Sequence, residues 1–240
     1  MSVLTLKLAG PLQAWGASAR FARRTTESAP TKSGVIGMLA AAKGIARGDD
    51  QALAALSSLR FAVRVDQPGT RLRDFHTAHH PVTGKSMPLS ERFYLADAVF
   101  VAAVEGDHTL ITELHDAVRH PVYPPYLGRR SCPPAHPVAL AVRTTALEQA
   151  LAEEAWQAAR WYQKLHHGKP IVSLTVLREA RTDEPHSDLQ RDQPVSFAPE
   201  HRRHDLRGVV TTAVDIPTPW AAKRPGPTHD PFAALTEDSA

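Results

Sequence analysis

The sequence predicts an α+β protein whose residues 1–144 form a ferredoxin-like β-α-β-β-α-β domain. Residues 2–8 and 60–66 alternate apolar with polar side chains, which is the pattern of half-buried strands. Residues 31–48 and 109–120 place apolar side chains at helical spacing. Further strand-like segments complete the order strand, helix, strand, then strand, helix, strand. That order defines the split β-α-β arrangement.

The first helix is expected to follow an arginine-rich loop that ends at residue 30. Thr31 or Ser33 can cap its N-terminus, and the helix should end near Gly48. Residues 50–59 predict a short second helix before the second strand.

Residues 67–92 interrupt the pattern with glycine, proline and charged residues, which predicts a protruding hairpin with Thr83 and Gly84 near its tip. Residues 93–104 are then expected to form one strand, and residues 138–143 the last strand of the domain. RNA-recognition domains use the same arrangement, but a fold alone does not fix a function.

A smaller, β-rich part is predicted over residues 145–216. Thr145 and Glu148 have the spacing of a capping box, which predicts a helix that continues to His167. The helix is expected to end there because glycine and proline follow.

The strands of this C-terminal part are predicted at residues 171–177 and 209–216. Between them, residues 178–207 are charged and should form a loop or an exposed hairpin. Residues 217–240 are rich in proline and lack periodicity, so we expect a partly disordered tail.

The composition indicates a cytoplasmic protein. The chain has 240 residues, a net charge of only +3 and a single cysteine, so it has no internal disulfide and fits a reducing compartment. No apolar run approaches the roughly 20 residues that span a bilayer, and the N-terminus lacks the features of a signal peptide. We therefore expect no membrane partner.

Residues 123–134, here called the proline loop, are the most informative stretch. Four prolines stiffen this loop, and it presents Arg129 and Arg130 beside Tyr123 and Tyr126. Guanidinium groups suit phosphate oxygens, and both guanidinium and phenol rings can stack on unpaired bases. The loop therefore predicts either a rigid site for a nucleic acid or a proline-rich connector with incidental charge.

The start of the first predicted helix is a candidate anion site. Its free amides carry the positive end of the helix dipole, and Thr31, Lys32 and Ser33 add further donors. The order of residues is not that of a Walker phosphate loop, so nucleotide hydrolysis is not supported. The alternative is an ordinary capped helix with small residues for close packing.

Two other groups of residues leave alternatives open. Residues 10–16 place Gln13 and Trp15 between glycines, either as an exposed amide and indole or, as we favour for Trp15, as a turn with the indole in the core. Residues 201–204 together with Arg207 form a basic cluster whose default interpretation is solvated surface.

The predicted hairpin and its base carry many charged and aromatic residues. These are Arg71, Arg73, Asp74, Phe75, His76, His79, His80, Lys85, Arg92 and Tyr94. Three histidines suggest a metal site, but the further ligands that zinc needs are not evident, so we expect no metal. His76 could act as an acid or base, although such a histidine is more often a neutral hydrogen-bonding group.

Five motifs in this chain, taken together, resemble the Cas5 family of CRISPR-associated proteins, in the branch that belongs to the type I-E Cascade complex. They lie in the family's order at residues 6–16, 30–37, 73–77, 94–98 and 125–133. The likeness covers most of residues 2–143 and thins beyond residue 144.

The resemblance implies a ferredoxin-like domain with a β-hairpin thumb at about residues 67–92. It implies a subunit that holds the 5′ handle of the mature CRISPR RNA, caps the filament of CasC subunits through its thumb and lies near the large subunit CasA. Target DNA would be met only as part of the complex, and no cofactor or metal is implied.

The resemblance also directs attention to particular residues for RNA binding. Lys32, Ser33, Arg129 and Arg130 are the phosphate candidates, and Gln13, Tyr126 and Cys132 are candidates for base or sugar contacts. Arg73, His76 and Arg92, on and beside the thumb, complete the predicted RNA-binding set.

Two other functional classes stay open. Related subunits of type I-C systems cleave precursor CRISPR RNA without metal, and His76 with Lys32 and a nearby tyrosine could be imagined in that role. Type I-E systems leave that step to the separate subunit CasE, and no matching Tyr, Lys and His pattern is found here. A protein adaptor without RNA contact would leave the paired arginines without a ligand.

Overall fold

A seven-stranded antiparallel sheet organises the chain, with the strand order β10-β11-β9-β4-β7-β1-β8. The computed structural model describes residues 1–16, 23–182, 184–185 and 188–219. The strands of this sheet are β1 (Ser2–Ala9), β4 (Arg60–Gln67), β7 (Val99–Gly106), β8 (Ala139–Arg143), β9 (Ile171–Glu179), β10 (Asp188–Ser196) and β11 (Arg203–Pro217). The described helices are α1 (Lys32–Lys43), α2 (Asp50–Ser57), α3 (His108–Arg119), α4 (Leu147–Glu153) and α5 (Arg160–Lys164).

Four of these strands follow the predicted β-α-β-β-α-β order. β4, β7, β1 and β8 are neighbours in the sheet; α1 and α2 connect β1 to β4, and α3 connects β7 to β8. β1 lies between β7 and β8 and pairs antiparallel with both, so each β-α-β unit is split by a strand of the other. The predicted α+β class is confirmed.

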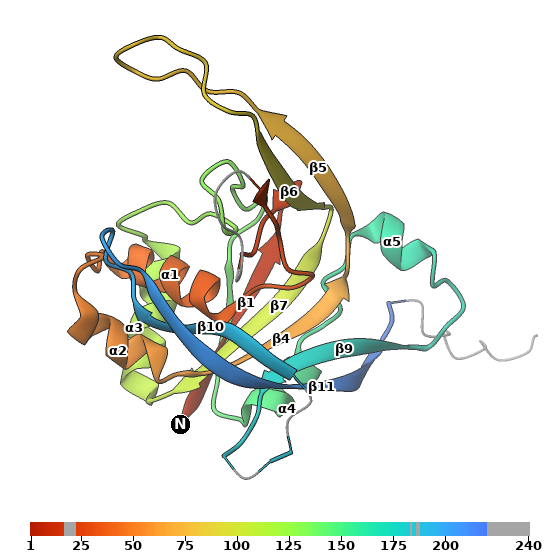
Figure 1. Cartoon of the computed structure of the whole chain (residues 1–240). Coiled ribbons are helices and arrows are strands. Elements are labelled where there is room, and N and C mark those ends of the chain that lie inside the picture. The colour runs from red at the N-terminus through yellow and green to blue at the C-terminus, as the bar shows by residue number, and fades with distance from the viewer. Residues whose placement is uncertain (17–22, 183, 186–187, 220–240) are drawn as a thin grey trace, which may run out of the picture.

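A second, small sheet carries the thumb. It consists of β2 (Leu12–Gln13), β3 (Arg23–Arg24), β5 (Thr70–His76) and β6 (Ser90–Ala96), and β6 pairs with the other three strands. β5 and β6 rise from the body and end in a long loop (Figure 1), where the hairpin was predicted.

One predicted strand is in fact two. Residues 93–104 were expected to be continuous, but Asp97 has a φ of 56°, and the chain leaves the thumb sheet there to enter the main sheet as β7. The amide of Asp97 donates to the carbonyl of Pro11, and the side chain of Gln67 donates to the carbonyl of Asp97. Apolar residues lie on both sides of the break, so the pattern alone did not reveal it.

The first helix ends earlier than predicted. Gly44, rather than Gly48, ends α1, with a φ of 77° and an amide that donates to the carbonyl of Ala41. A left-handed residue of this kind is a common way to end a helix.

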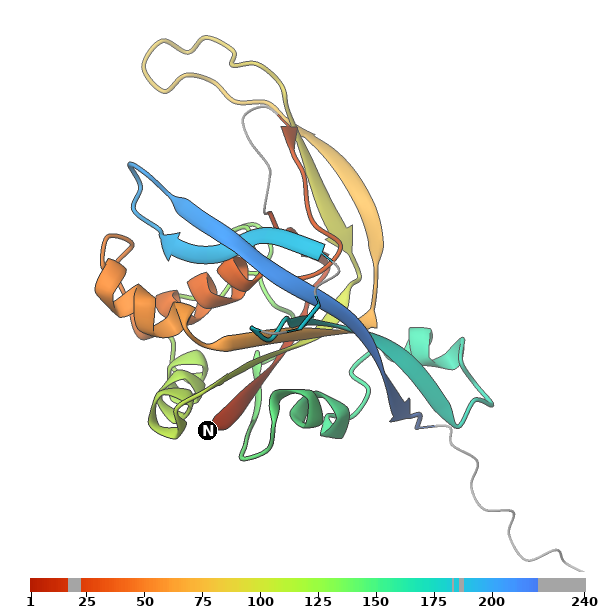
Figure 2. The same cartoon turned by 60° about the horizontal axis from the view of Figure 1, so that its bottom comes forward.

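The C-terminal strands extend the main sheet and curl it into half a barrel. β9 pairs with β4, so the sheet continues past residue 144, and β10 then packs against α1 and α2. Figure 2 shows β10 and β11 passing over one side of these helices while α4 covers the opposite side of the sheet. Residues 178–207, predicted as a loop or an exposed hairpin, therefore contain β10, a strand that pairs with β11 and packs against two helices. A division of the chain into folding units near residue 144 stays a prediction.

The helix predicted from Thr145 to His167 is wrong. Two short helices, α4 and α5, replace it; Ala146 begins α4 without a side-chain cap, and the hydroxyl of Thr145 is buried without a partner. At the end of α4 the chain turns to an extended conformation at Glu154. The buried guanidinium of Arg64 in β4 donates to the carbonyls there, at 2.7 Å from Glu154 and 2.8 Å from Ala155, and so provides the partners that a continued helix would have provided.

The main core lies between the sheet and the helices α1 and α3, and Trp15 is fully buried in it, as we favoured. Among the described residues, no helix is long and apolar enough to span a membrane. β11 ends at Pro217, and the predicted tail lies outside the described residues from residue 220 onward.

Candidate functional site

A groove of about 790 Å³ lies between α1, the proline loop and the turn that joins β10 to β11. The start of α1 contributes Ser33 and Gly34, and the proline loop contributes Tyr126 and Arg130. The two segments singled out in the sequence are far apart along the chain, with Gly34 in the first and Tyr126 in the second, and they line one groove. Its volume is within the range of about 300–1,000 Å³ that is typical of ligand sites.

The start of α1 is held close to the floor of the groove. The hydroxyl of Thr31 accepts from the amide of Gly34, so Thr31 rather than Ser33 caps the helix. Gly34 lies against the indole of Trp15, where an added Cβ would be 2.8 Å from the ring. Only glycine lets the helix approach Trp15 this closely, and Ser33 beside it is left facing the groove.

The proline loop is fixed by backbone hydrogen bonds and buried side chains. The amide of Ala14 donates to the carbonyl of Leu127, and the amide of Leu127 donates to the carbonyl of Cys132. Gly128 has a φ of 85°, and a Cβ there would lie 1.8 Å from the carbonyl oxygen of Ala14. The backbone of the loop is therefore fixed against the body of the protein, and the loop forms one wall of the groove.

The two adjacent arginines of the loop have different environments. Arg129 places its guanidinium 4.7 Å from the ring centre of Tyr94, and its Nη2 donates to the carbonyl of Arg24 at 2.8 Å. Arg130 is exposed and lines the groove. Arg129 therefore attaches the loop to the base of the thumb, whereas Arg130 is available to a ligand.

The charged side chains that line the groove are all basic. They belong to Arg47, Arg130 and Arg202, and no carboxylate lies among the described lining residues. The lining also includes the aromatic side chains of Tyr123, Tyr126 and Phe197, as well as the buried Trp15. This combination of guanidinium groups and aromatic faces suits an anionic ligand with flat rings, such as a single-stranded nucleic acid.

The predicted anion site at the start of α1 is already occupied by the protein. The backbone amide of Lys32 donates to Oδ2 of Asp192 in β10 at 2.7 Å, and Arg207 holds the same carboxylate with bonds of 2.9 Å and 2.8 Å. Asp192 is fully buried and Arg207 nearly so. Arg207 was predicted to lie on a solvated basic surface, and this prediction is wrong because the side chain is buried against Asp192.

Lys32, a predicted phosphate ligand, is likewise buried and paired within the protein. Its side chain is 2% exposed, and its ammonium group donates to Glu179 at 3.1 Å. Burial lowers the pKa of Lys32, although the carboxylate of Glu179 opposes that shift. A buried, paired ammonium group cannot meet a phosphate without breaking this cluster.

Gln13 and Cys132 also point inward. The amide nitrogen of Gln13 donates to the carbonyls of Leu8 and Ala98, and its oxygen accepts from the indole of Trp15. Cys132 is buried, and burial raises the pKa of its thiol. Both residues support the walls of the groove instead of facing a ligand.

The remaining candidates lie on the thumb sheet, outside the groove. The guanidinium of Arg73 lies 4.6 Å from the ring centre of Phe75, and Nε2 of His76 lies 2.6 Å from Oδ2 of Asp74. Arg92, on β6, has a buried Nε without a hydrogen-bond partner. His76 on the thumb and the buried Lys32 are thus in separate environments, and the described residues contain no group of three or more possible metal ligands.

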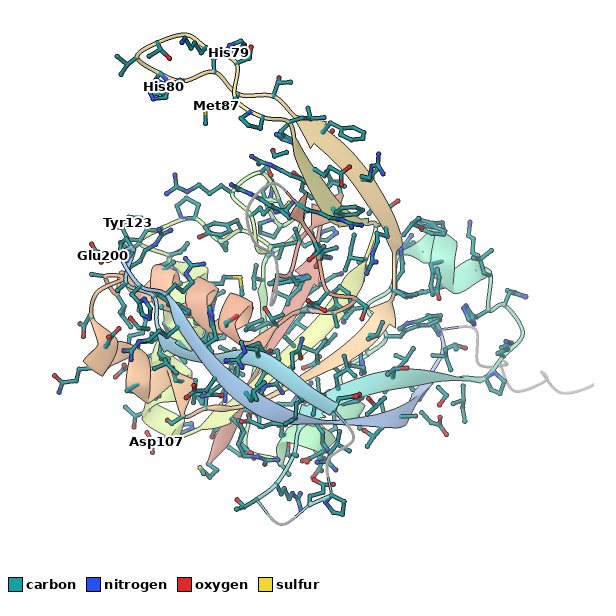
Figure 3. All side chains as sticks on the ribbon, in the orientation of Figure 1. His79, His80, Met87, Asp107, Tyr123 and Glu200 are labelled. Carbon is teal, nitrogen blue, oxygen red and sulfur yellow. The ribbon has the colours of Figure 1, made fainter. Side chains whose placement is uncertain are left out.

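Sequence reasoning missed the far wall of the groove. Phe197, Arg202 and His204 come from the end of β10, the following turn and β11, in a region interpreted as solvated. The basic cluster at residues 201–204 was the available signal, but nothing in the local sequence shows that the sheet curls over α1. Figure 3 shows Glu200, in that turn, on the same side of the molecule as Tyr123.

Known proteins resemble this chain over most of its length. The profile of a family described as CRISPR-associated protein (Cas_Cas5) matches residues 3–210. The CRISPR system Cascade subunit CasD of Escherichia coli (strain K12) is 42% identical over 157 residues, covering 58% of this chain and 70% of that protein.

Two solved structures share the fold. A chain described as "Crystal structure of Cas protein" has 34% identity and a TM-score of 0.70, covering 91% of this chain and 99% of that one. A chain of a "CRISPR RNA-guided surveillance complex" has 32% identity and a TM-score of 0.74, covering 95% of both.

Proposed function

Because this chain belongs to the Cas5 family of CRISPR-associated proteins, we propose that it is a non-catalytic, RNA-binding subunit of a type I-E Cascade surveillance complex. Its task is to hold the 5′ handle of the mature CRISPR RNA in the groove between α1, the proline loop and the β10–β11 turn. In the assembled complex this serves the targeting of foreign DNA, which the subunit meets only as part of that complex.

The observation that carries this proposal is the lining of the groove. Every charged side chain on its described lining is basic, and aromatic side chains line the same groove. A single strand of RNA offers phosphates and unstacked bases, which such a surface binds through charge and stacking together. Arg130 contacts a phosphate, Ser33 donates a hydrogen bond, and Tyr126 provides a face for a base.

The thumb contacts a protein partner, the neighbouring CasC subunit of the filament. Within the described part of the chain, the hairpin exposes the apolar side chains of Leu72, Phe75, Val82, Met87 and Leu89. Clustered exposed apolar residues of this kind mark protein interfaces. The subunit also lies near the large subunit CasA.

RNA binding by the purified full chain tests the proposal. Handle RNA should bind in EDTA without being cut, and affinity should fall as salt rises because phosphate contacts release counterions. Arg130→Ala should weaken binding, whereas Arg203→Gln, an exposed arginine outside the groove, should not. Discrete cleavage that is lost in His76→Ala would overturn the proposal in favour of a metal-independent endoribonuclease.

A further inference from the structure

The wall of the groove that comes from the C-terminal hairpin brings three planar side chains together. The guanidinium of Arg202 lies 5.8 Å from the ring centre of Phe197, and the rings of Phe197 and His204 are 6.1 Å apart at 54°. All three line the groove opposite the proline loop. They lie in the part of the chain where the sequence offered no candidate.

We propose that Phe197, Arg202 and His204 form a stacking subsite for one unpaired nucleobase of the bound RNA. The inference rests on the proposed function and extends it, because it assigns base contacts to the C-terminal hairpin rather than to the proline loop alone. Guanidinium planes and aromatic rings are the surfaces on which splayed bases stack.

The position of this subsite is fixed by α1. A Cβ placed on Gly37 would lie 3.6 Å from the edge of the Phe197 ring, so the ring lies in van der Waals contact range of the helix at this glycine. Phe197 also packs against the main core. A stacking surface that is already held in place loses little conformational entropy when a ligand arrives.

The chemistry of the subsite favours a base over a phosphate. Burial, together with the neighbouring Arg202 guanidinium, lowers the pKa of His204, which favours the neutral imidazole. A neutral imidazole carries one donor and one acceptor, which suits the edge of a base. Arg202 is exposed, so it can turn its plane toward an incoming ring without breaking a buried contact.

An abasic scan combined with Phe197→Leu tests the subsite. The probe is handle RNA in which each nucleotide in turn lacks its base, titrated against the full chain. At one position the abasic change should weaken binding by roughly 5-fold or more, the scale of one base stacked on an aromatic ring. In Phe197→Leu the same abasic change should have no further effect, because the surface that the base uses is gone.

Arg202→Gln is the second variant, since an exposed side chain can be changed without harm to folding, and Arg203→Gln is its matched control. We expect Arg202→Gln to reduce the abasic effect at the same position and Arg203→Gln to leave it unchanged. Thermal unfolding of Phe197→Leu verifies that the variant is folded.

The possible failures are distinguishable. If Arg130→Ala weakens RNA binding but no abasic position depends on Phe197, the subsite is refuted and the proposed function stands. If the unmodified chain does not bind handle RNA, the proposed function itself fails. Loss of association with CasA in Phe197→Leu, at unchanged RNA affinity, would assign this wall to a protein and overturn the inference.

Discussion

Arg129 and Arg130 are adjacent in the sequence, yet we predict that their substitution by alanine has different consequences. Arg129→Ala removes the stack on Tyr94 and the hydrogen bond to the carbonyl of Arg24. A cation–π contact contributes about 0.5–1 kcal/mol and an exposed hydrogen bond a similar amount, so the free energy of unfolding should fall by about 1–2 kcal/mol.

Arg130→Ala should leave stability nearly unchanged, because Arg130 is exposed and makes no hydrogen bond or ion pair within the described part of the chain. Its effect should appear in RNA binding. Loss of one phosphate contact to a single strand should reduce the slope of log K against log salt by about 0.7. Affinity should fall about tenfold, corresponding to about 1.4 kcal/mol.

Two measurements on each variant separate these effects. Thermal unfolding should show Tm lowered by about 2–8 °C for Arg129→Ala, since 1 kcal/mol corresponds to about 2–4 °C in a protein of this size. Filter binding of handle RNA over a salt series should show the altered slope only for Arg130→Ala. Equal slopes for both variants, or a lower Tm for Arg130→Ala alone, would refute the assignment of the two roles.

Three further predictions concern the left-handed backbone of Gly128, the buried pair of Arg64 with Asp66, and the ion pair of Arg178 with Glu184. Gly128→Ala should lower the free energy of unfolding by about 1–2 kcal/mol because alanine disfavours the left-handed backbone conformation. The clash of the new Cβ with the carbonyl of Ala14 should lower it further. An unchanged Tm would contradict this prediction. Arg64→Met should cost about 3–5 kcal/mol in urea unfolding, because Asp66 stays buried without its cation, and a loss below about 1 kcal/mol would count against this reasoning. The Arg178 guanidinium lowers the pKa of Glu184 to about 2, so the stabilisation from this pair is present above the ordinary pKa and is lost as pH falls through about 2. An NMR titration of Glu184 should show this midpoint, and Arg178→Gln should raise it toward the ordinary value, with the backbone amide of Arg181 still holding it lower.

The sequence predicted those elements whose periodicity is local. The alternation in β1 and β4, the helical spacing in α1 and α3 and the breaks around the thumb all arise within windows of about ten residues, and each predicted an element that is present. The proline loop and the start of α1 could be singled out because rigid backbone and planar cations are visible in the residues themselves, and both segments line the groove.

The rest could not be predicted because it depends on distant partners. Whether the start of α1 meets a ligand or the protein's own carboxylate is decided by Asp192, which is 160 positions away from Lys32. Where the helix expected after Thr145 breaks off, the carbonyl of Glu154 accepts from Arg64, a residue in a strand on which that segment packs. Neither contact leaves a local signal.

The contact between Lys32 and Asp192 also has a consequence for the time course of biosynthesis. A nascent chain that has left the ribosome only as far as β9 has already made α1 and the proline loop, but its Lys32 amide still lacks the carboxylate that caps it. The far wall of the groove is absent at that moment as well. The groove that we propose for RNA is therefore complete only after β10 and the start of β11 have been made.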